Sequence, residues 1–171
     1  MPTNPSSHTL VAADTNVLLD CACGEELVLD ALATIRRKIK SVRMIVSPTV
    51  LEELGHWARF AKQPDRQRAA QTALRSLRTK WDFLPVNLVP VGHGVVEQIA
   101  SRLQKTGLIP TAEYHDALIL SGAALLGCAI LLSADTHLLE LDYEKVSSEL
   151  KACDVGASVI ATPREIVTEF F

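Results

Sequence analysis

Residues 117–134 read ALILSGAALLGCAILLSA, an uncharged run of about the length that a membrane-spanning helix requires. Two glycines interrupt the run, Asp116 and Asp135 stand at its ends, and neither flank carries the Lys or Arg typical of a membrane anchor. We therefore interpret the run as a buried helix that ends near Gly127, followed by a buried strand over residues 128–132. A helix that leads directly into a buried strand is typical of an α/β protein.

The same alternation of short apolar runs and helical patterns continues on both sides of this stretch. Strands are predicted over residues 9–13, 43–47, 86–91, 128–132 and 157–161. Helices are predicted over residues 25–40, 48–62, 64–82, 112–127 and 135–141. A further helix follows residues 92–94 and ends at residue 105, and a last helix begins at residues 162–163. Strands that alternate with helices become parallel through right-handed crossovers. The predicted fold is a three-layer α/β/α sandwich with a five-stranded parallel sheet.

The composition is that of one globular domain over residues 1–171, with residues 1–8 as a flexible N-terminus. The 48% apolar and 22% charged content excludes disorder as the default state. The N-terminus has no apolar core, so no signal peptide is expected. The four cysteines form no CxxC pair, which argues against a zinc ribbon and favours reduced thiols in a cytoplasmic protein.

The net charge of −3 argues against a generally basic nucleic-acid binder, but it conceals an asymmetry. Residues 36–80 contain 12 Lys and Arg against three acidic residues, a net charge of +9. The basic residues of the predicted helices in this block form either a track for phosphates or an ordinary solvated helix face. Those with the strongest case for binding substrate are Arg59, Lys62, Arg66 and Arg68.

Carboxylates stand close to the predicted strand ends, where parallel sheets bind their ligands. Asp14 follows the first strand, and Asp135 follows the fourth. Glu52 and Glu53 lie one turn into the helix after the second strand, and Asp116 lies one turn into the helix before the fourth. Acids gathered at one site raise each other's pKa unless cations lie among them. Oxygen ligands favour Mg²⁺ or Mn²⁺, and a pair of such ions can support phosphodiester cleavage.

Each acid also has a structural interpretation. Asp14 and Asp135 could each cap a following helix. Asp116 could be a solvated helix residue, although its helix is apolar nearly all round, where a charge requires a partner or a metal. Glu52 and Glu53 point about 100° apart on a helix, so only one of them can face a shared site.

Four segments resemble the signature segments of PIN-domain ribonucleases, and they occur in that family's order: DTNVLL (14–19), SPTVLEEL (47–54), DALIL (116–120) and LSADTHLL (132–139). The run TPREI (162–166) is similar to the ending of one toxin-like branch. The resemblance covers nearly the whole chain. It implies a five-stranded parallel sheet and a metal-dependent endoribonuclease site.

The resemblance also assigns residues and partners. It implies that Mg²⁺ or Mn²⁺ is held by four acids: Asp14, Glu53, Asp116 and Asp135. Glu53 matches the second of the family's acids better than Glu52 does. Two polar residues, Asn16 and Ser133, match residues that support the site. Many members are toxins similar to VapC that form homodimers and are blocked by a small antitoxin, whereas others process RNA without one. At 171 residues the chain is somewhat long for the toxin type.

Other side chains carry weaker hypotheses. His137 is a candidate substrate contact, and His56 and His115 are unfavoured as metal ligands beside better oxygen donors. Trp57 and Trp81 fit core packing better than base stacking. A catalytically inactive module that binds RNA or a protein stays open as an alternative.

Other enzyme and signalling classes lack their defining residues here. A phosphatase of the haloacid dehalogenase type would have a second Asp at residue 16, where Asn stands. A receiver domain would have a Lys near the fifth strand, and that segment contains none. There is no GxxxxGK[ST] phosphate loop.

Overall fold

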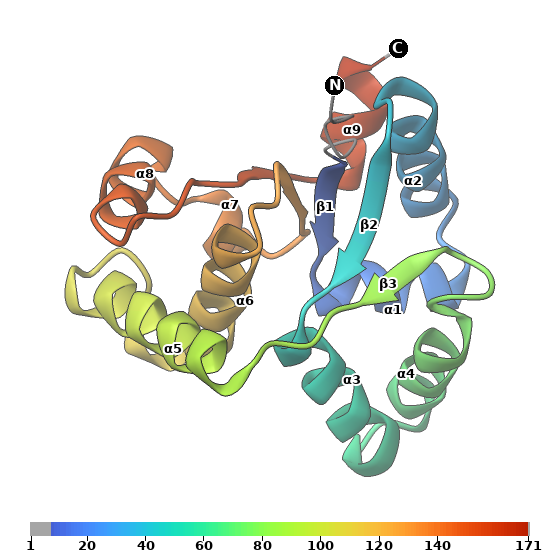
Figure 1. The fold of residues 1–171 in the computed structure, drawn as a ribbon. Helices are drawn as coiled ribbons and strands as arrows, with labels where there is room; N and C mark the ends of the chain where they lie inside the picture. The colour runs from blue at the N-terminus through green and yellow to red at the C-terminus, as the bar shows by residue number, and fades with distance from the viewer. Residues whose placement is uncertain (1–7, 171) are drawn as a thin grey trace.

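The computed structural model describes residues 8–170, so the flexible N-terminus expected over residues 1–8 lies outside the described residues except for residue 8. Strands and helices alternate along the chain (Figure 1). The order is β1 (Thr9–Ala13), α1 (Thr15–Cys23), α2 (Glu26–Lys38), β2 (Val42–Val46), α3 (Pro48–Phe60), α4 (Pro64–Ser76), β3 (Phe83–Pro85), α5 (Pro90–Lys105), η1 (Thr111–Glu113), α6 (Tyr114–Leu125), β4 (Ile130–Leu132), α7 (Thr136–Leu139), α8 (Tyr143–Lys151), β5 (Val159–Ala161) and α9 (Pro163–Glu169).

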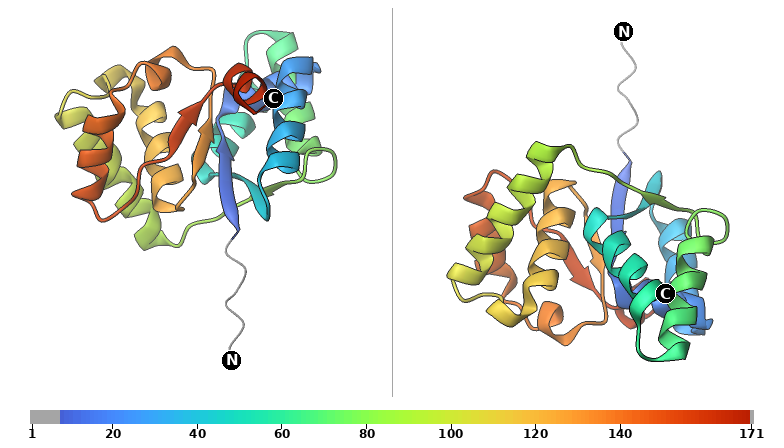
Figure 2. Two further views of the ribbon diagram at one scale, coloured as in Figure 1. Left: turned by 90° about the horizontal axis from the view of Figure 1, so that it is seen from above. Right: turned by 90° about the horizontal axis from the view of Figure 1, so that it is seen from below.

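The five strands form one parallel sheet in the order β3-β2-β1-β4-β5, with β1 at its centre. Helices α5, α6 and α8 lie on one side of the sheet, and α2 and α9 lie on the other (Figures 1 and 2). The predicted three-layer α/β/α sandwich is therefore confirmed. The order of the strands places the ends of β1 and β4 next to each other, although more than 100 residues separate them along the chain.

The long apolar run divides as expected into a helix and a strand. Helix α6 ends at Leu125, and Gly127 adopts the left-handed conformation (φ 70°) that glycine takes at no steric cost. The N–H of Cys128 then donates to the carbonyl of Ala123 at 2.9 Å, which closes the helix before β4 begins. Among residues 8–170, no helix combines the length and apolar character needed to cross a bilayer.

The third strand was predicted in the wrong place. It occupies Phe83–Pro85 rather than residues 86–91, and α5 already begins at Pro90, so residues 92–94 lie inside the helix. Phe83 is 1% exposed and fills the core, whereas Val89 and Val91 are 71% and 77% exposed. The valines raise strand propensity without being buried, and proline at the first helical position favours the helix start instead.

Other helix boundaries also depart from the predictions. Helix α4 ends at Ser76 rather than near residue 82, and α8 occupies a segment for which no helix was predicted. Helix α1 is the helix that Asp14 caps, as one interpretation of this acid anticipated, although its range was not predicted. The start of α8 is stabilised by Asp142, whose carboxylate accepts the backbone N–H groups of Glu144 and Lys145. Asp142 is visible in the sequence as a cap, but the apolar pattern that follows it is too short to predict a helix.

Candidate active site

The neighbouring strands β1 and β4 place two of the predicted acids, Asp14 and Asp135, at the same edge of the sheet. Ala13 of β1 lies opposite Leu132 of β4, and the N–H of Asp14 donates to the carbonyl of Leu132 at 2.9 Å. Asp14 follows β1 directly, and Asp135 follows β4 three residues after its end. The parallel pairing thus carries both carboxylates to the same edge of the sheet, as predicted for ligand sites of this architecture.

Both residues predicted to support the site lie in this junction. The Oγ of Ser133 donates to Oδ2 of Asp14 at 2.7 Å and accepts the N–H of Asp135 at 3.0 Å. Oδ1 of Asn16 accepts the N–H of Ala134 at 3.4 Å. Together these bonds tie the loop after β4 to the start of α1, so they set the position of both acids.

Asp14 caps a helix and also faces other acids. Its Oδ1 accepts the N–H of Thr15 at 2.6 Å at the start of α1, and the residue is only 4% exposed. The pKa of Asp14 is raised from 3.8 to about 6, chiefly by burial and to a smaller extent by the negative charges of Glu53 and Asp135. The hydrogen bonds from Ser133 and Thr15 oppose this rise.

Helix α3 turns Glu53 rather than Glu52 toward this site. The Oγ1 of Thr15 donates to Oε2 of Glu53 at 2.5 Å, and Glu53 is half-buried while Glu52 is exposed. Thr15 is a residue that the sequence analysis missed. Its place directly after Asp14 was visible, but its partner lies 38 residues away and depends on the orientation of α3.

Asp116, in the first turn of α6, completes the group. Burial, and then the charges of Asp135, Asp14 and Glu113, raise its pKa from 3.8 to about 7, against the opposing effect of His137. Its Oδ2 atom is buried and has no hydrogen-bond partner. A buried, unpaired carboxylate oxygen is costly unless a proton or a cation satisfies it.

Asp135 and His137 lie at the edge of the group. Oδ1 of Asp135 accepts the N–H of His137 at 2.8 Å and so caps α7, as the structural interpretation of this acid anticipated. Nε2 of His137 lies 3.5 Å from Oε1 of Glu113. His137 is therefore next to the acids and half-exposed, in a place open to substrate.

The acid set suits a hard cation but does not form a finished metal site. Within residues 8–170, none of Asp14, Glu53, Asp116 and Asp135 forms an ion pair, and no three His, Cys, Asp or Glu side chains converge in a geometry that could hold a metal. The donors are all carboxylates, the ligands preferred by Mg²⁺ and Mn²⁺. Oδ2 of Asp116, which has no hydrogen-bond partner among the described residues, is an oxygen that a cation would satisfy.

The four predicted substrate-binding basic residues lie at the α3–α4 hairpin: Arg59 on α3, Lys62 in the turn, and Arg66 and Arg68 on α4. Arg68 is paired with Asp65 of its own helix. The guanidinium of Arg66 lies over the ring of Trp57, 3.7 Å from its centroid. Trp81 is buried, as expected for core packing.

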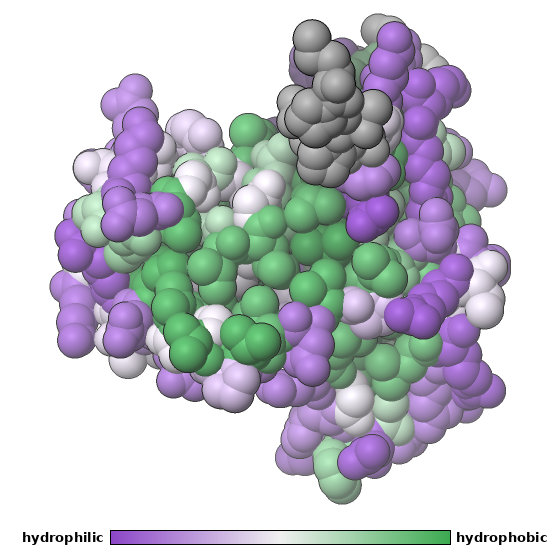
Figure 3. Space-filling view, in the orientation of Figure 1, coloured by the Kyte–Doolittle hydropathy of each residue, from purple (hydrophilic) through white to green (hydrophobic). Residues whose placement is uncertain are grey.

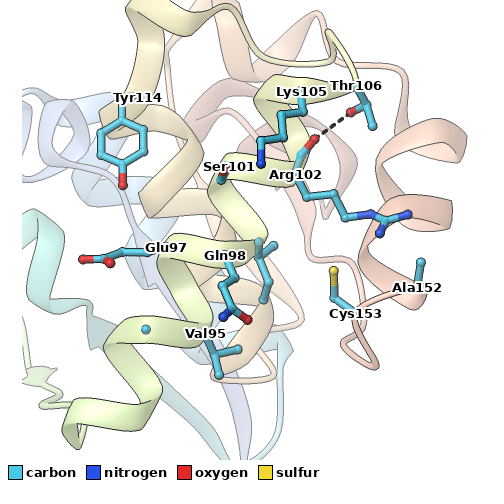
Figure 4. Close-up of a pocket in the computed structure, with 12 residues that line it drawn as sticks. Val95, Glu97, Gln98, Ser101, Arg102, Lys105, Thr106, Tyr114, Ala152 and Cys153 are labelled. Carbon is cyan, nitrogen blue, oxygen red and sulfur yellow. Dashed lines mark hydrogen bonds between the residues drawn. The ribbon is translucent and has the colours of Figure 1, made fainter.

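A large surface hollow of the described chain lies away from these acids. It lies between α5 and α8, with a volume of about 1100 Å³, and Figure 4 shows Arg102 and Cys153 on one side and Tyr114 on the other. Arg102 is engaged with Glu149 of α8 at 2.6 Å. This hollow contains none of the four predicted acids, so the candidate active site is defined by the carboxylates and not by pocket size.

The chain belongs to the PIN domain family, whose model matches residues 11–143 and so includes all four acids. PIN domains are nucleases, which makes this protein a PIN nuclease by family. Comparison with curated protein sequences gives no match.

Solved structures share this fold at low sequence identity. VapBC2 from Rickettsia felis, bound to a DNA fragment from its promoter, is 14% identical over 90% of this chain and 98% of that chain, with a TM-score of 0.62. VapBC-1 from nontypeable Haemophilus influenzae is 16% identical over 91% of this chain and 98% of that chain, with a TM-score of 0.55. FitAcB from Neisseria gonorrhoeae is 17% identical over 90% and 97%, with a TM-score of 0.52.

Proposed function

We propose that this protein is a metal-dependent endoribonuclease and the toxin of a toxin–antitoxin pair. The observation that carries the proposal is the gathering of carboxylates from the β1–α1 junction, α3, α6 and the β4–α7 loop, none of which forms an ion pair within residues 8–170. Membership of the PIN domain family supports nuclease chemistry. The excess of Lys and Arg over residues 36–80 supports a nucleic-acid substrate.

In this proposal Asp14, Glu53, Asp116 and Asp135 would hold Mg²⁺ or Mn²⁺. When bound, the cation supplies the positive charge that activates water and stabilises the leaving oxygen of a phosphodiester. The chain orients the donors: Ser133 holds Asp14, and Thr15 holds Glu53. Because these side chains are anchored before substrate arrives, little reorganisation is needed during the reaction.

A cleavage assay tests the function. Labelled single-stranded RNA is incubated with the purified protein in Mn²⁺, in Mg²⁺ and in chelator, with single-stranded DNA of the same sequence as a parallel substrate. We expect RNA cleavage with either metal and none in chelator. Cleavage that persists in chelator would contradict the carboxylate site, and RNA binding without cleavage in any condition would identify an inactive binding module.

We further propose a small antitoxin as partner. The solved structures that share this fold include VapBC and FitAcB complexes, and a group of carboxylates suits a partner that inserts a basic side chain. Co-expression with the product of the adjacent reading frame is expected to yield a stable complex in which RNA cleavage is suppressed. Unchanged cleavage in the presence of that product, or failure of the two to co-purify, would contradict this partner.

A homodimer is the proposed assembly. Val89 and Val91, at the start of α5, are among the most exposed apolar residues, and Figure 3 shows apolar side chains gathered on this face of the molecule. Exposed apolar patches often mark interfaces between proteins. Light scattering should give the mass of a dimer, and Val91→Glu should give that of a monomer; a monomeric wild-type protein would contradict the assembly.

A further inference from the structure

The far end of α3 carries a cluster of aromatic and basic side chains that the acid site does not use. A surface pocket of about 290 Å³ lies at the turn between α3 and α4, and its walls include His56, Trp57, Phe60, Lys62 and Arg66. Such a combination of ring faces and cations is typical of surfaces that bind single-stranded nucleic acid.

Phe60 is the exposed element of this cluster. It is 66% exposed at the last residue of α3, and its ring lies 5.2 Å from that of His56, with the two planes inclined at 48°. Trp57, by contrast, is already covered on one face by the guanidinium of Arg66. The free ring surface of the pocket is therefore supplied by Phe60 and His56.

The charge around these rings favours a polyanion. Within residues 8–170 the side chains of Arg59 and Lys62 take part in no ion pair, whereas Arg68 is neutralised by Asp65. The acid on the neighbouring surface of α3 is Glu52, which is exposed. Arg59, Lys62 and Arg66 thus present positive charge beside an exposed ring, which is complementary to phosphates beside a base.

The hairpin that carries the cluster is held in place. The side-chain amide of Gln67 donates to the carbonyl of Arg59 at 3.1 Å, and that of Gln71 donates to the carbonyl of Ala58 at 3.0 Å. These bonds satisfy carbonyls at the end of α3, which a helix end otherwise leaves unpaired. The platform is therefore ordered in advance, which lowers the cost of binding.

Helical geometry connects the cluster to the acids. Phe60 follows Glu53 by seven residues, about two turns, so both side chains lie on nearly the same face of α3, about 10 Å apart along its axis. His56 lies between them on the same side. A strand whose phosphodiester reaches Glu53 can therefore extend along α3 to Phe60.

We propose that Phe60 and His56 form a stacking platform for a base of single-stranded RNA close to the cleaved bond, with Lys62 and Arg66 contacting the adjacent phosphates. This inference rests on the proposed ribonuclease function and adds to it the position and chemistry of a substrate subsite. Within the basic block of residues 36–80, this inference assigns RNA binding to the residues at the α3–α4 turn. Arg68, which is paired with Asp65, takes no part in it.

Binding of a labelled single-stranded RNA of about a dozen nucleotides, measured by fluorescence anisotropy in chelator, tests the platform without cleavage. Phe60→Ala is expected to weaken binding about five- to a hundredfold, the range for losing one base stack. Phe60→Tyr should bind like wild type, whereas Phe60→Leu, which keeps an apolar side chain without a ring face, should be as weak as Phe60→Ala. Tyr143→Ala, which removes a 51% exposed aromatic from α8, is the matched control and should have no effect.

A second readout identifies the base. An abasic nucleotide is moved through the RNA, and the position that stacks on Phe60 should weaken binding to wild type but not to Phe60→Ala. Lys62→Ala, whose side chain is exposed, should reduce the salt dependence of binding without changing this abasic pattern.

The outcomes separate this inference from the proposed function. If wild type cleaves RNA and Phe60→Ala binds it equally well, the platform is refuted while the function stands. If Phe60→Leu matches wild type, the contact is apolar and not a stack, and the platform is again refuted. Phe60→Ala that binds RNA normally but loses a protein partner would show a protein-docking site instead. Wild-type protein that neither binds nor cleaves RNA would overturn the function and the platform together.

Discussion

Replacing Asp14 or Asp116 by Asn is expected to lower RNA cleavage on the order of 10²- to 10³-fold, because each change removes negative charge from a site whose proposed task is to hold a cation. Binding of RNA in chelator should change by less than about threefold, since the substrate contacts proposed above lie on α3 and α4. Initial cleavage rates at fixed Mn²⁺ and anisotropy in chelator measure the two effects separately.

The adjacent glutamates offer a matched control for this prediction. Glu53→Gln should lose cleavage as Asp14→Asn does, because Glu53 faces Asp14 and is held by Thr15. Glu52→Gln should cleave like wild type, because its side chain is exposed on the same turn of α3. Equal activity of Glu53→Gln and wild type would remove α3 from the site, and unchanged activity of both Asp variants would remove the site altogether.

The second large effect is on stability. In chelator, the free energy of unfolding should fall as pH rises from about 4 to about 7. The pKa of Asp14 is raised to about 6 and that of Asp116 to about 7, from an ordinary value of 3.8, so the folded protein binds these protons more tightly than the unfolded chain does. Their contribution to stability is fully present below pH 4 and is lost as pH rises through 6 and 7. At about 1.4 kcal/mol per pKa unit, Asp14 alone contributes on the order of 3 kcal/mol.

Urea denaturation at several pH values measures this effect. Asp14→Asn should be more stable than wild type at pH 8 and close to it at pH 4, because Asn cannot ionise. Asp142 is the contrasting control. Hydrogen bonds from the backbone N–H and the side chain of Lys145, and from the backbone N–H of Glu144, lower its pKa, so its contribution to stability is lost as pH falls. If the free energy of unfolding depends on pH in the same way for wild type and Asp14→Asn, the ionised carboxylate of Asp14 is not destabilising in the folded protein, and the prediction is wrong.

Adding metal should reverse the destabilisation. A cation that binds only the folded protein raises the melting temperature, and the stabilisation grows with the logarithm of its concentration once that exceeds its dissociation constant. Mn²⁺ is therefore expected to stabilise wild type at pH 8 and to have little effect on Asp14→Asn. An equal shift for both proteins would show that Mn²⁺ binds elsewhere.

Local patterns predicted the positions of three candidate acids because these residues stand at strand and helix ends. Asp14 and Asp135 follow buried strands, and Asp116 lies in the first turn of an apolar helix, so the alternation of strands and helices indicated their places relative to the sheet edge. Their role as metal ligands is a proposal that the family resemblance suggested. The third strand could not, because residues 86–91 have high strand propensity and yet lie on the surface. Propensity describes a residue's own preference, whereas burial depends on what packs against it.

Sequence by itself therefore determined the class of fold and nominated the candidate acids: the alternation of buried strands and helices favours a parallel sheet, and a parallel sheet collects the residues at its strand ends. Only the tertiary structure decided which glutamate faces Asp14, that Thr15 holds it, and that Phe60 stands exposed beside Arg66 and Lys62. Each of these depends on how α3 is oriented against the sheet and against α4. That orientation arises from contacts between residues distant in sequence, which no local pattern contains.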